Sequence, residues 1–106
     1  MSAWGHRLRP ASESEAKYGC SSCRGERKPA VCALEYQYVT GRAGRVSSAR
    51  KPRCKEHAYR AALKYDLMPE FLLLRHHGWP LVKWSEREAF WNRLIGAVDT
   101  IEESGP

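Results

Sequence analysis

The sequence predicts a small α+β domain that a bound metal ion stabilises, and three observations support this fold class. The chain has only 106 residues, and a domain of that size buries too little apolar surface to be comfortably stable on packing alone. One β-rich segment is followed by three segments with helical patterns. Two short pairs, Cys20 with Cys23 and Cys54 with His57, flank the β-rich segment, and such pairs are typical ligands of structural zinc.

Residues 1–17 are polar and lack a regular apolar pattern, so we expect an N-terminal arm without a packed element. The first twenty residues contain no apolar run, and we therefore expect no secretory signal peptide. No stretch approaches the length of a membrane span, so we expect no membrane partner. Both expectations predict a cytoplasmic protein. Thiols stay reduced in the cytoplasm, which favours metal binding over disulfide formation.

The segment from Ala30 to Thr40 predicts a β-strand, because β-branched and aromatic residues dominate it. Residues 41–44 supply a turn, and residues 45–51 return as the second strand of a hairpin. We expect Pro52 to end that strand, since proline cannot donate to a ladder. At period two, one face of the first strand carries Cys32, Leu34, Tyr36 and Tyr38.

Helical signals begin at the second ligand pair. An alanine-rich stripe predicts a helix over residues 55–65, with Glu56 and Arg60 as an i,i+4 ion pair. A second short helix over residues 70–77 follows Pro69, which suits a first helical position.

The last helix has the broadest apolar face. Ser85 and Glu88 predict a capping box at its start, and the pattern runs to about Glu103. The face comprises Phe90, Trp91, Leu94, Ile95, Val98 and Ile101.

A cysteine turn, a hairpin and a ligand pair that opens a helix follow one another over residues 18–66. This order resembles the treble-clef zinc-finger family, in which the metal holds the cysteine turn, called the zinc knuckle, against the N-terminus of the helix. The resemblance implies a zinc unit over residues 18–66 and a helical extension, residues 67–106, packed on it in one structural domain. The run from Tyr38 to Ser47 is also similar to small zinc-binding proteins of high-GC bacteria and their phages, which implies no activity.

Five side chains are candidates for four ligand positions, because Cys32 lies between the two pairs. We expect Cys20, Cys23, Cys54 and His57 to bind one structural Zn²⁺, with Cys32 as a small buried side chain. In an alternative all-cysteine set, Cys32 replaces His57. A further alternative is a protein without metal whose thiols are merely buried or reactive.

We expect no enzymatic activity and no small-molecule substrate. Zinc with four protein ligands has no open position for water. The Cys-x-x-Cys pair does not follow a strand in an α/β pattern, as a redox pair would. The strand after it lacks the histidine of His-Asn-His nucleases, and the zinc deaminase signature is missing. His76 and His77 could form a second metal or acid–base site, but we expect them simply to end a short helix.

Positive charge is concentrated in the first part of the chain. Residues 1–60 carry thirteen Lys and Arg against five Asp and Glu, a net +8, whereas residues 61–106 carry a net −2. Six cations without an intervening acid suggest contacts with phosphates, although a merely solvated face is the alternative. They are Arg42, Arg45, Arg50, Lys51, Arg53 and Lys55.

Aromatic side chains crowd into residues 79–91. Most of them should fill the core, yet such a density also suits a protein interface. The candidate interface residues are Trp79, Trp84 and Trp91.

These observations favour a non-enzymatic nucleic-acid-binding accessory of a transcription, replication or ribosomal complex, with either DNA or RNA as partner. The alternative is a protein–protein interaction adaptor or inhibitor, of a kind that phages also encode, whose basic hairpin meets an acidic partner.

Overall fold

A computed structural model gives the structure of residues 5–103, and of the side chains from residue 5 to residue 96. These residues form a three-stranded antiparallel sheet and four α-helices, which confirms the expected α+β class. The strands are β1 (His6–Pro10), β2 (Cys32–Thr40) and β3 (Arg45–Arg53). The helices are α1 (Glu13–Tyr18), α2 (Lys55–Tyr65), α3 (Met68–His76) and α4 (Arg87–Glu103), with a 3₁₀ turn, η1 (Trp84–Glu86), before α4.

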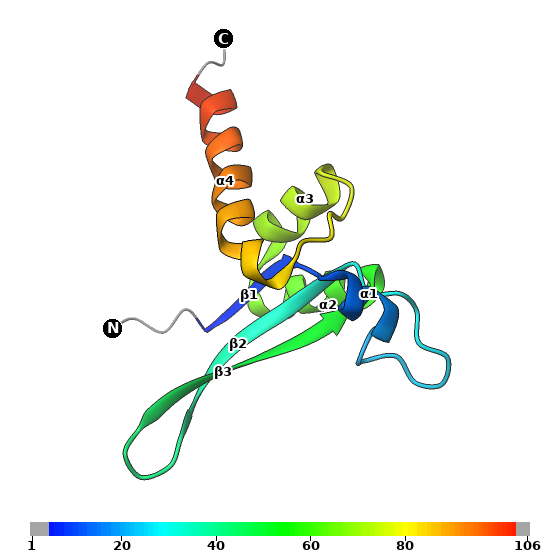
Figure 1. The fold of residues 1–106 in the computed structure, drawn as a ribbon, viewed down its shortest axis with the longest axis vertical. Helices are drawn as coiled ribbons and strands as arrows, with labels where there is room; N and C mark the ends of the chain where they lie inside the picture. The colour runs from blue at the N-terminus through cyan, green and yellow to red at the C-terminus, as the bar shows by residue number, and fades with distance from the viewer. Residues whose placement is uncertain (1–4, 104–106) are drawn as a thin grey trace.

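The central strand of the sheet is β2, which pairs with β1 on one side and β3 on the other. β1 pairs only with residues 32–36 of β2, whereas β3 pairs along residues 32–40. The distal parts of β2 and β3, residues 37–48, therefore form a two-stranded ribbon. Figure 1 shows this ribbon extending away from the helices. The predicted hairpin is confirmed.

The apolar core lies on one face of the sheet. That face carries Leu8 of β1 and Leu34 of β2, which are paired neighbours. α2 covers it with alanines, whose small side chains let helix and sheet approach closely. α3 packs beside α2, and both α3 and α4 pack along β1. The buried helical residues of the core include Ala58, Ala61, Ala62, Phe71, Leu74, Trp91 and Leu94.

A network of ion pairs lies on the opposite face of the sheet. The Glu35 side chain on β2 is only 7% exposed, and its carboxylate accepts a hydrogen bond from Arg7 Nε at 2.8 Å and pairs with Arg50 of β3. Arg50 also donates to both carboxylate oxygens of Glu15 on α1, at 2.8 Å each. Arg7 reaches Glu88 of α4 at 3.2 Å. The network therefore joins α1 and α4 to all three strands.

The expectation of an irregular N-terminal arm over residues 1–17 is wrong for residues 6–17. These residues form β1 and α1, and Leu8 is fully buried. The strand is short and alternates Arg7, Leu8 and Arg9, so its apolar signal rests on one residue. Its stability comes from pairing with β2, which begins more than twenty positions later. Trp4 lies outside the described residues.

Helix α1 begins at a capping box that the sequence analysis did not identify. Ser12 Oγ accepts a hydrogen bond from the Glu15 backbone N–H at 3.2 Å, and the Glu15 carboxylate accepts one from the Ser12 N–H at 2.9 Å. The Ser-x-x-Glu signature was present in the sequence. It was missed because a six-residue helix has no apolar periodicity to accompany it.

Pro52 does not end β3, contrary to the prediction, because the strand continues to Arg53. β3 is an edge strand, and the Pro52 carbonyl accepts a hydrogen bond from the Ser21 N–H at 3.0 Å on the side away from β2. The N and the C=O of one strand residue point to the same side, so the missing proline donor faces outward and costs no ladder bond.

The predicted capping box at Ser85 is also wrong. Ser85 lies within η1, and α4 begins at Arg87. The Glu86 N–H donates to the Lys83 carbonyl at 2.9 Å, so a 3₁₀ turn, common at helix starts, precedes the helix.

Candidate metal centre

A tight loop between α1 and β2 carries the first ligand pair. The Cys20 N–H donates to the Lys28 carbonyl at 2.9 Å, and the Cys23 N–H donates to the Cys20 carbonyl at 3.4 Å. The Ser21 N–H donates to the Pro52 carbonyl at 3.0 Å, which attaches the loop to the end of β3. These bonds place the loop directly beside the start of α2.

The second ligand pair opens α2. Cys54 is the N-cap residue with an extended backbone, and its carbonyl accepts the first helical hydrogen bond, from the Ala58 N–H at 2.8 Å. His57 lies three positions later, in the first turn. Residues three apart lie on the same side of a helix, so both side chains face the loop.

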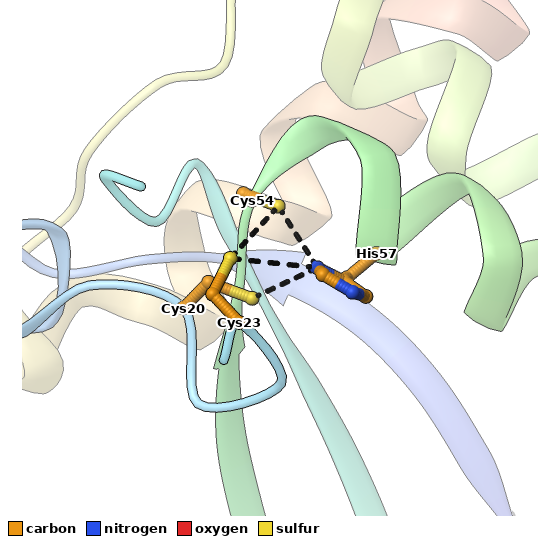
Figure 2. Close-up of side chains that lie close together, drawn as sticks. All are labelled: Cys20, Cys23, Cys54 and His57. Carbon is orange, nitrogen blue, oxygen red and sulfur yellow. Dashed lines mark hydrogen bonds between the residues drawn. The ribbon is translucent and has the colours of Figure 1, made fainter. Parts of the chain in front are cut away.

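The four side chains converge on one point, as Figure 2 shows. The Nδ1 atom of His57 lies 3.4 Å from Cys20 Sγ, 3.6 Å from Cys23 Sγ and 3.2 Å from Cys54 Sγ. The sulfurs of Cys23 and Cys54 are 3.9 Å apart. All four atoms lie within 4.8 Å of one another, so the group could hold a metal ion.

These separations match a tetrahedron around zinc. Bonds of about 2.3 Å to sulfur and about 2.0 Å to nitrogen would place a sulfur about 3.5 Å from the nitrogen and two sulfurs about 3.8 Å apart. The four distances above, from 3.2 to 3.9 Å, scatter around those two values. Ligation through Nδ1 requires a neutral imidazole whose proton is on Nε2.

The surroundings of the thiols differ. Burial alone would raise the pKa of Cys20, but hydrogen bonds from the backbone N–H groups of Cys54 and Ser22 outweigh it, so its pKa is lowered. Burial is also the largest influence on Cys54, and there it raises the pKa. Of these two thiols, Cys20 gives a thiolate, the form that ligates metal, more readily than Cys54.

Cys32 is not a member of the cluster. Its side chain is fully buried in the apolar core beside Leu34 and Ala58. Burial raises its pKa to about 12, so the thiol stays protonated at neutral pH. This position supports the mixed Cys and His ligand set and disfavours the all-cysteine alternative.

The six cations proposed for phosphate contacts occupy different environments. Arg42 and Arg45 are exposed at the tip of the ribbon, and Lys51 and Lys55 are exposed nearer the sheet. Arg53 is partly buried and donates to the Ser21 hydroxyl. Arg50 does not face solvent as expected, because Glu15 and Glu35 hold its guanidinium and its side chain is only 12% exposed.

The three candidate interface tryptophans also diverge. Trp91 is buried in the core, where the Arg9 guanidinium lies 4.0 Å from its ring centroid. Trp79 is partly buried and contacts the Phe71 ring edge-on at 5.2 Å. Only Trp84 is largely exposed, at 55%, and Arg87 lies over its ring at 3.7 Å. Among the three, Trp84 is the one that a partner could reach extensively.

An aromatic row that sequence reasoning missed crosses the core-side face of the sheet. It consists of Tyr65 of α2, His6 of β1, and Tyr36 and Tyr38 of β2. The parity of the two tyrosines was visible in the sequence. Nothing in the sequence brings His6 and Tyr65 to them, because these residues come from two other elements.

His76 and His77 lie at the end of α3, as expected, with their rings 5.2 Å apart. Neither belongs to a cluster of metal-ligating side chains within the described part of the chain.

Comparison with models of protein families, with curated proteins and with solved structures finds no match. Over residues 5–103, no helix combines the length and the apolar character that crossing a membrane requires.

Proposed function

We propose that the protein holds one structural Zn²⁺ through Cys20, Cys23, Cys54 and His57 in a treble-clef-like unit. The agreement of the ligand-atom distances with a zinc tetrahedron carries this proposal. Four protein donors fill the tetrahedron, so the metal has no position for a substrate and the role is structural rather than catalytic. The order of cysteine loop, hairpin and helix supports the treble-clef assignment.

We further propose that the metal-stabilised unit is a non-enzymatic nucleic-acid-binding module within a larger complex. One observation supports this above others: exposed cations lie on the ribbon that projects from the body, at Arg42 and Arg45, and near its base, at Lys51. No acidic residue occurs from position 36 to position 55. A projecting two-stranded ribbon of net positive charge can follow a phosphate backbone with little competition from its own carboxylates.

Fluorescence anisotropy with a labelled duplex of generic sequence tests the proposal. Three neutralised phosphates give a salt slope of about −2.7, so affinity should fall about 40-fold between about 50 and about 200 mM salt. The double variant Arg42→Glu, Arg45→Glu should weaken binding at least about tenfold at low salt. Lys83→Glu with Arg93→Glu changes the net charge equally at exposed positions outside the ribbon, and should bind nearly as the unaltered protein does.

Arg50 is excluded from the charge-reversal set because its guanidinium is part of the ion-pair network. Absence of binding to both duplex and single-stranded probes at low salt would refute the nucleic-acid proposal.

A second candidate is an adaptor that binds an acidic protein. The exposed Trp84 beside Arg87 supports it, because Trp and Arg are enriched at interface hot spots. Polyglutamate is a suitable probe. If it binds as tightly as an oligonucleotide, and Trp84→Ala weakens that binding, the adaptor is favoured over the nucleic-acid module.

A further inference from the structure

We propose that the nucleic acid is single-stranded, and that its bases stack on Tyr36 and Tyr38 while its phosphates contact Lys51, Arg53 and Lys64. This inference rests on the proposed nucleic-acid function and specifies its substrate class. The aromatic row and the cations beside it carry the argument.

The aromatic row is continuous across three elements. The rings of Tyr65 and His6 are stacked at 3.7 Å with an interplanar angle of 8°, and His6 stacks on Tyr36 at 5.6 Å. Tyr38 follows at 6.1 Å from Tyr36, tilted by 45°. His6 and Tyr65 thereby hold the ring of Tyr36 from one side, which orders the inner end of the row.

The outer end of the row is open to solvent. Tyr38 is 43% exposed, because it lies on the ribbon beyond the part of the sheet that α2 covers. The β3 residues paired with Tyr36 and Tyr38 are Ala49 and Ser47. These short side chains leave the rings standing above their neighbours, as a stacking platform requires.

Cations border the row on the same face. Lys51 pairs with Leu34 in the sheet, so its side chain projects from the core-side face. It lies two residues after Ala49, on the same face of β3. Next to it is a pocket of ≈ 180 Å³. Its lining includes His57, Arg53, Arg60, Lys64 and Tyr65.

Two of the pocket cations are free of a carboxylate partner in the described part of the chain. Arg60 pairs with Glu56 at 2.9 Å. Arg53 instead donates to a serine hydroxyl and a carbonyl, and the Lys64 ammonium lies 5.3 Å from the Tyr65 ring centroid. The pocket is therefore positively charged and suits a phosphate.

This combination favours a single strand over a duplex. Stacking needs bases whose faces are accessible, and in a duplex the neighbouring base pairs cover them. Aromatic rings beside a cationic track are the arrangement by which proteins bind single strands without reading sequence. A duplex would use the phosphate contacts but would gain nothing from Tyr38.

The test uses the zinc-loaded chain of 106 residues and two labelled probes of about 12 nucleotides, oligo(dT) and a matched duplex. Tyr38→Ala should weaken binding to oligo(dT) about tenfold or more, because one stacked base is lost. Tyr38→Phe, which keeps the ring, should restore most of the affinity. Val39→Ala is the matched control, since Val39 is the next residue on the opposite face of the ribbon and is 68% exposed.

Salt dependence separates stacking from charge. Lys51→Ala should reduce the magnitude of the salt slope for oligo(dT) by about 0.7, the value for one phosphate contact on a single strand. Tyr38→Ala should lower the affinity and leave the slope unchanged.

The outcomes distinguish this inference from the function on which it rests. If neither probe binds at low salt, the nucleic-acid function itself fails. If both probes bind and Tyr38→Ala behaves like Val39→Ala, the nucleic-acid function stands and the single-strand inference is overturned. A duplex preference that Tyr38→Ala does not change overturns it as well.

Discussion

At the scale of single residues, side-chain direction divides the four cysteines into two kinds. Cys20, Cys23 and Cys54 converge with His57 at the junction of the loop and α2. Cys32, the first residue of β2, points into the core instead, where it acts as a small apolar side chain. Sequence spacing alone left both ligand sets open, and side-chain direction distinguishes them.

Replacing individual cysteines tests this division. We expect Cys32→Ala to retain one metal ion per chain and to lower the free energy of unfolding by about 1 kcal/mol, because only a small buried group is lost. Cys54→Ala should lose the metal. Metal content by native mass spectrometry measures both. Loss of the metal from Cys32→Ala, with retention in His57→Ala, would restore the all-cysteine ligand set.

Glu35 is the residue on which the ion-pair network depends, because it contacts both Arg7 and Arg50. Glu35→Gln should lower the free energy of unfolding by about 2 kcal/mol, since Arg7 and Arg50 each lose one charged hydrogen-bond partner. Urea denaturation measures this change. Glu26→Gln, at an exposed position, should have little effect, and equal stability of the two variants would contradict a structural role for the network.

At the scale of elements, the ligand loop depends on one glycine. Gly19 has φ +90°, and a Cβ at this position would lie 2.9 Å from Arg27 Cβ and 3.2 Å from the Lys28 carbonyl oxygen. Gly25, in the same loop, also has positive φ, at +77°, but has nothing within 4 Å. The loop therefore offers a pair of glycines with similar backbone strain and different steric surroundings.

Gly19→Ala should be clearly more destabilising than Gly25→Ala. In both variants the positive φ should lower the free energy of unfolding by about 1 kcal/mol. Gly19→Ala must in addition displace the backbone around Arg27 and Lys28, to which Cys20 is hydrogen-bonded. We expect an additional loss of about 1–2 kcal/mol and weaker metal retention. Thermal unfolding and zinc competition with a chromophoric chelator measure these effects. Similar results for the two variants would show that the loop absorbs the clash.

At the scale of the whole molecule, the candidate metal centre lies where the cysteine loop meets the junction of β3 and α2, which follow one another directly at Cys54. The Ser21–Pro52 backbone hydrogen bond attaches the loop there, and the four candidate ligands add a second connection. A chain of 106 residues has little packing in reserve. Metal binding and folding should therefore be coupled.

Treatment with a chelator tests this coupling. Metal removal should lower the unfolding temperature by at least about 10 °C and reduce helical signal, because the binding free energy of a structural zinc contributes directly to folding. Circular dichroism measures both effects. One equivalent of Zn²⁺ should restore the original unfolding curve. An unchanged curve in protein verified to be free of metal would refute the structural role.

Signals contained within a few neighbouring residues allowed the sequence to predict local structure. The hairpin, the helix over residues 55–65 and the Glu56–Arg60 ion pair depend on neighbours in the chain, and all three are observed. The residues of the candidate metal centre were identified for the same reason, since each pair of candidate ligands needs only a short spacing.

Contacts between distant segments were determined only by the tertiary structure. β1 is stable because its backbone pairs with that of β2. Arg50 is not part of the exposed basic surface, because α1 places Glu15 in an ion pair with its guanidinium. The aromatic row likewise unites side chains from α2, β1 and β2. Composition and periodicity carry no information about which surfaces meet, so the sequence by itself determined the local elements and the candidate ligands. Folding decided which charges and rings remain available to a partner.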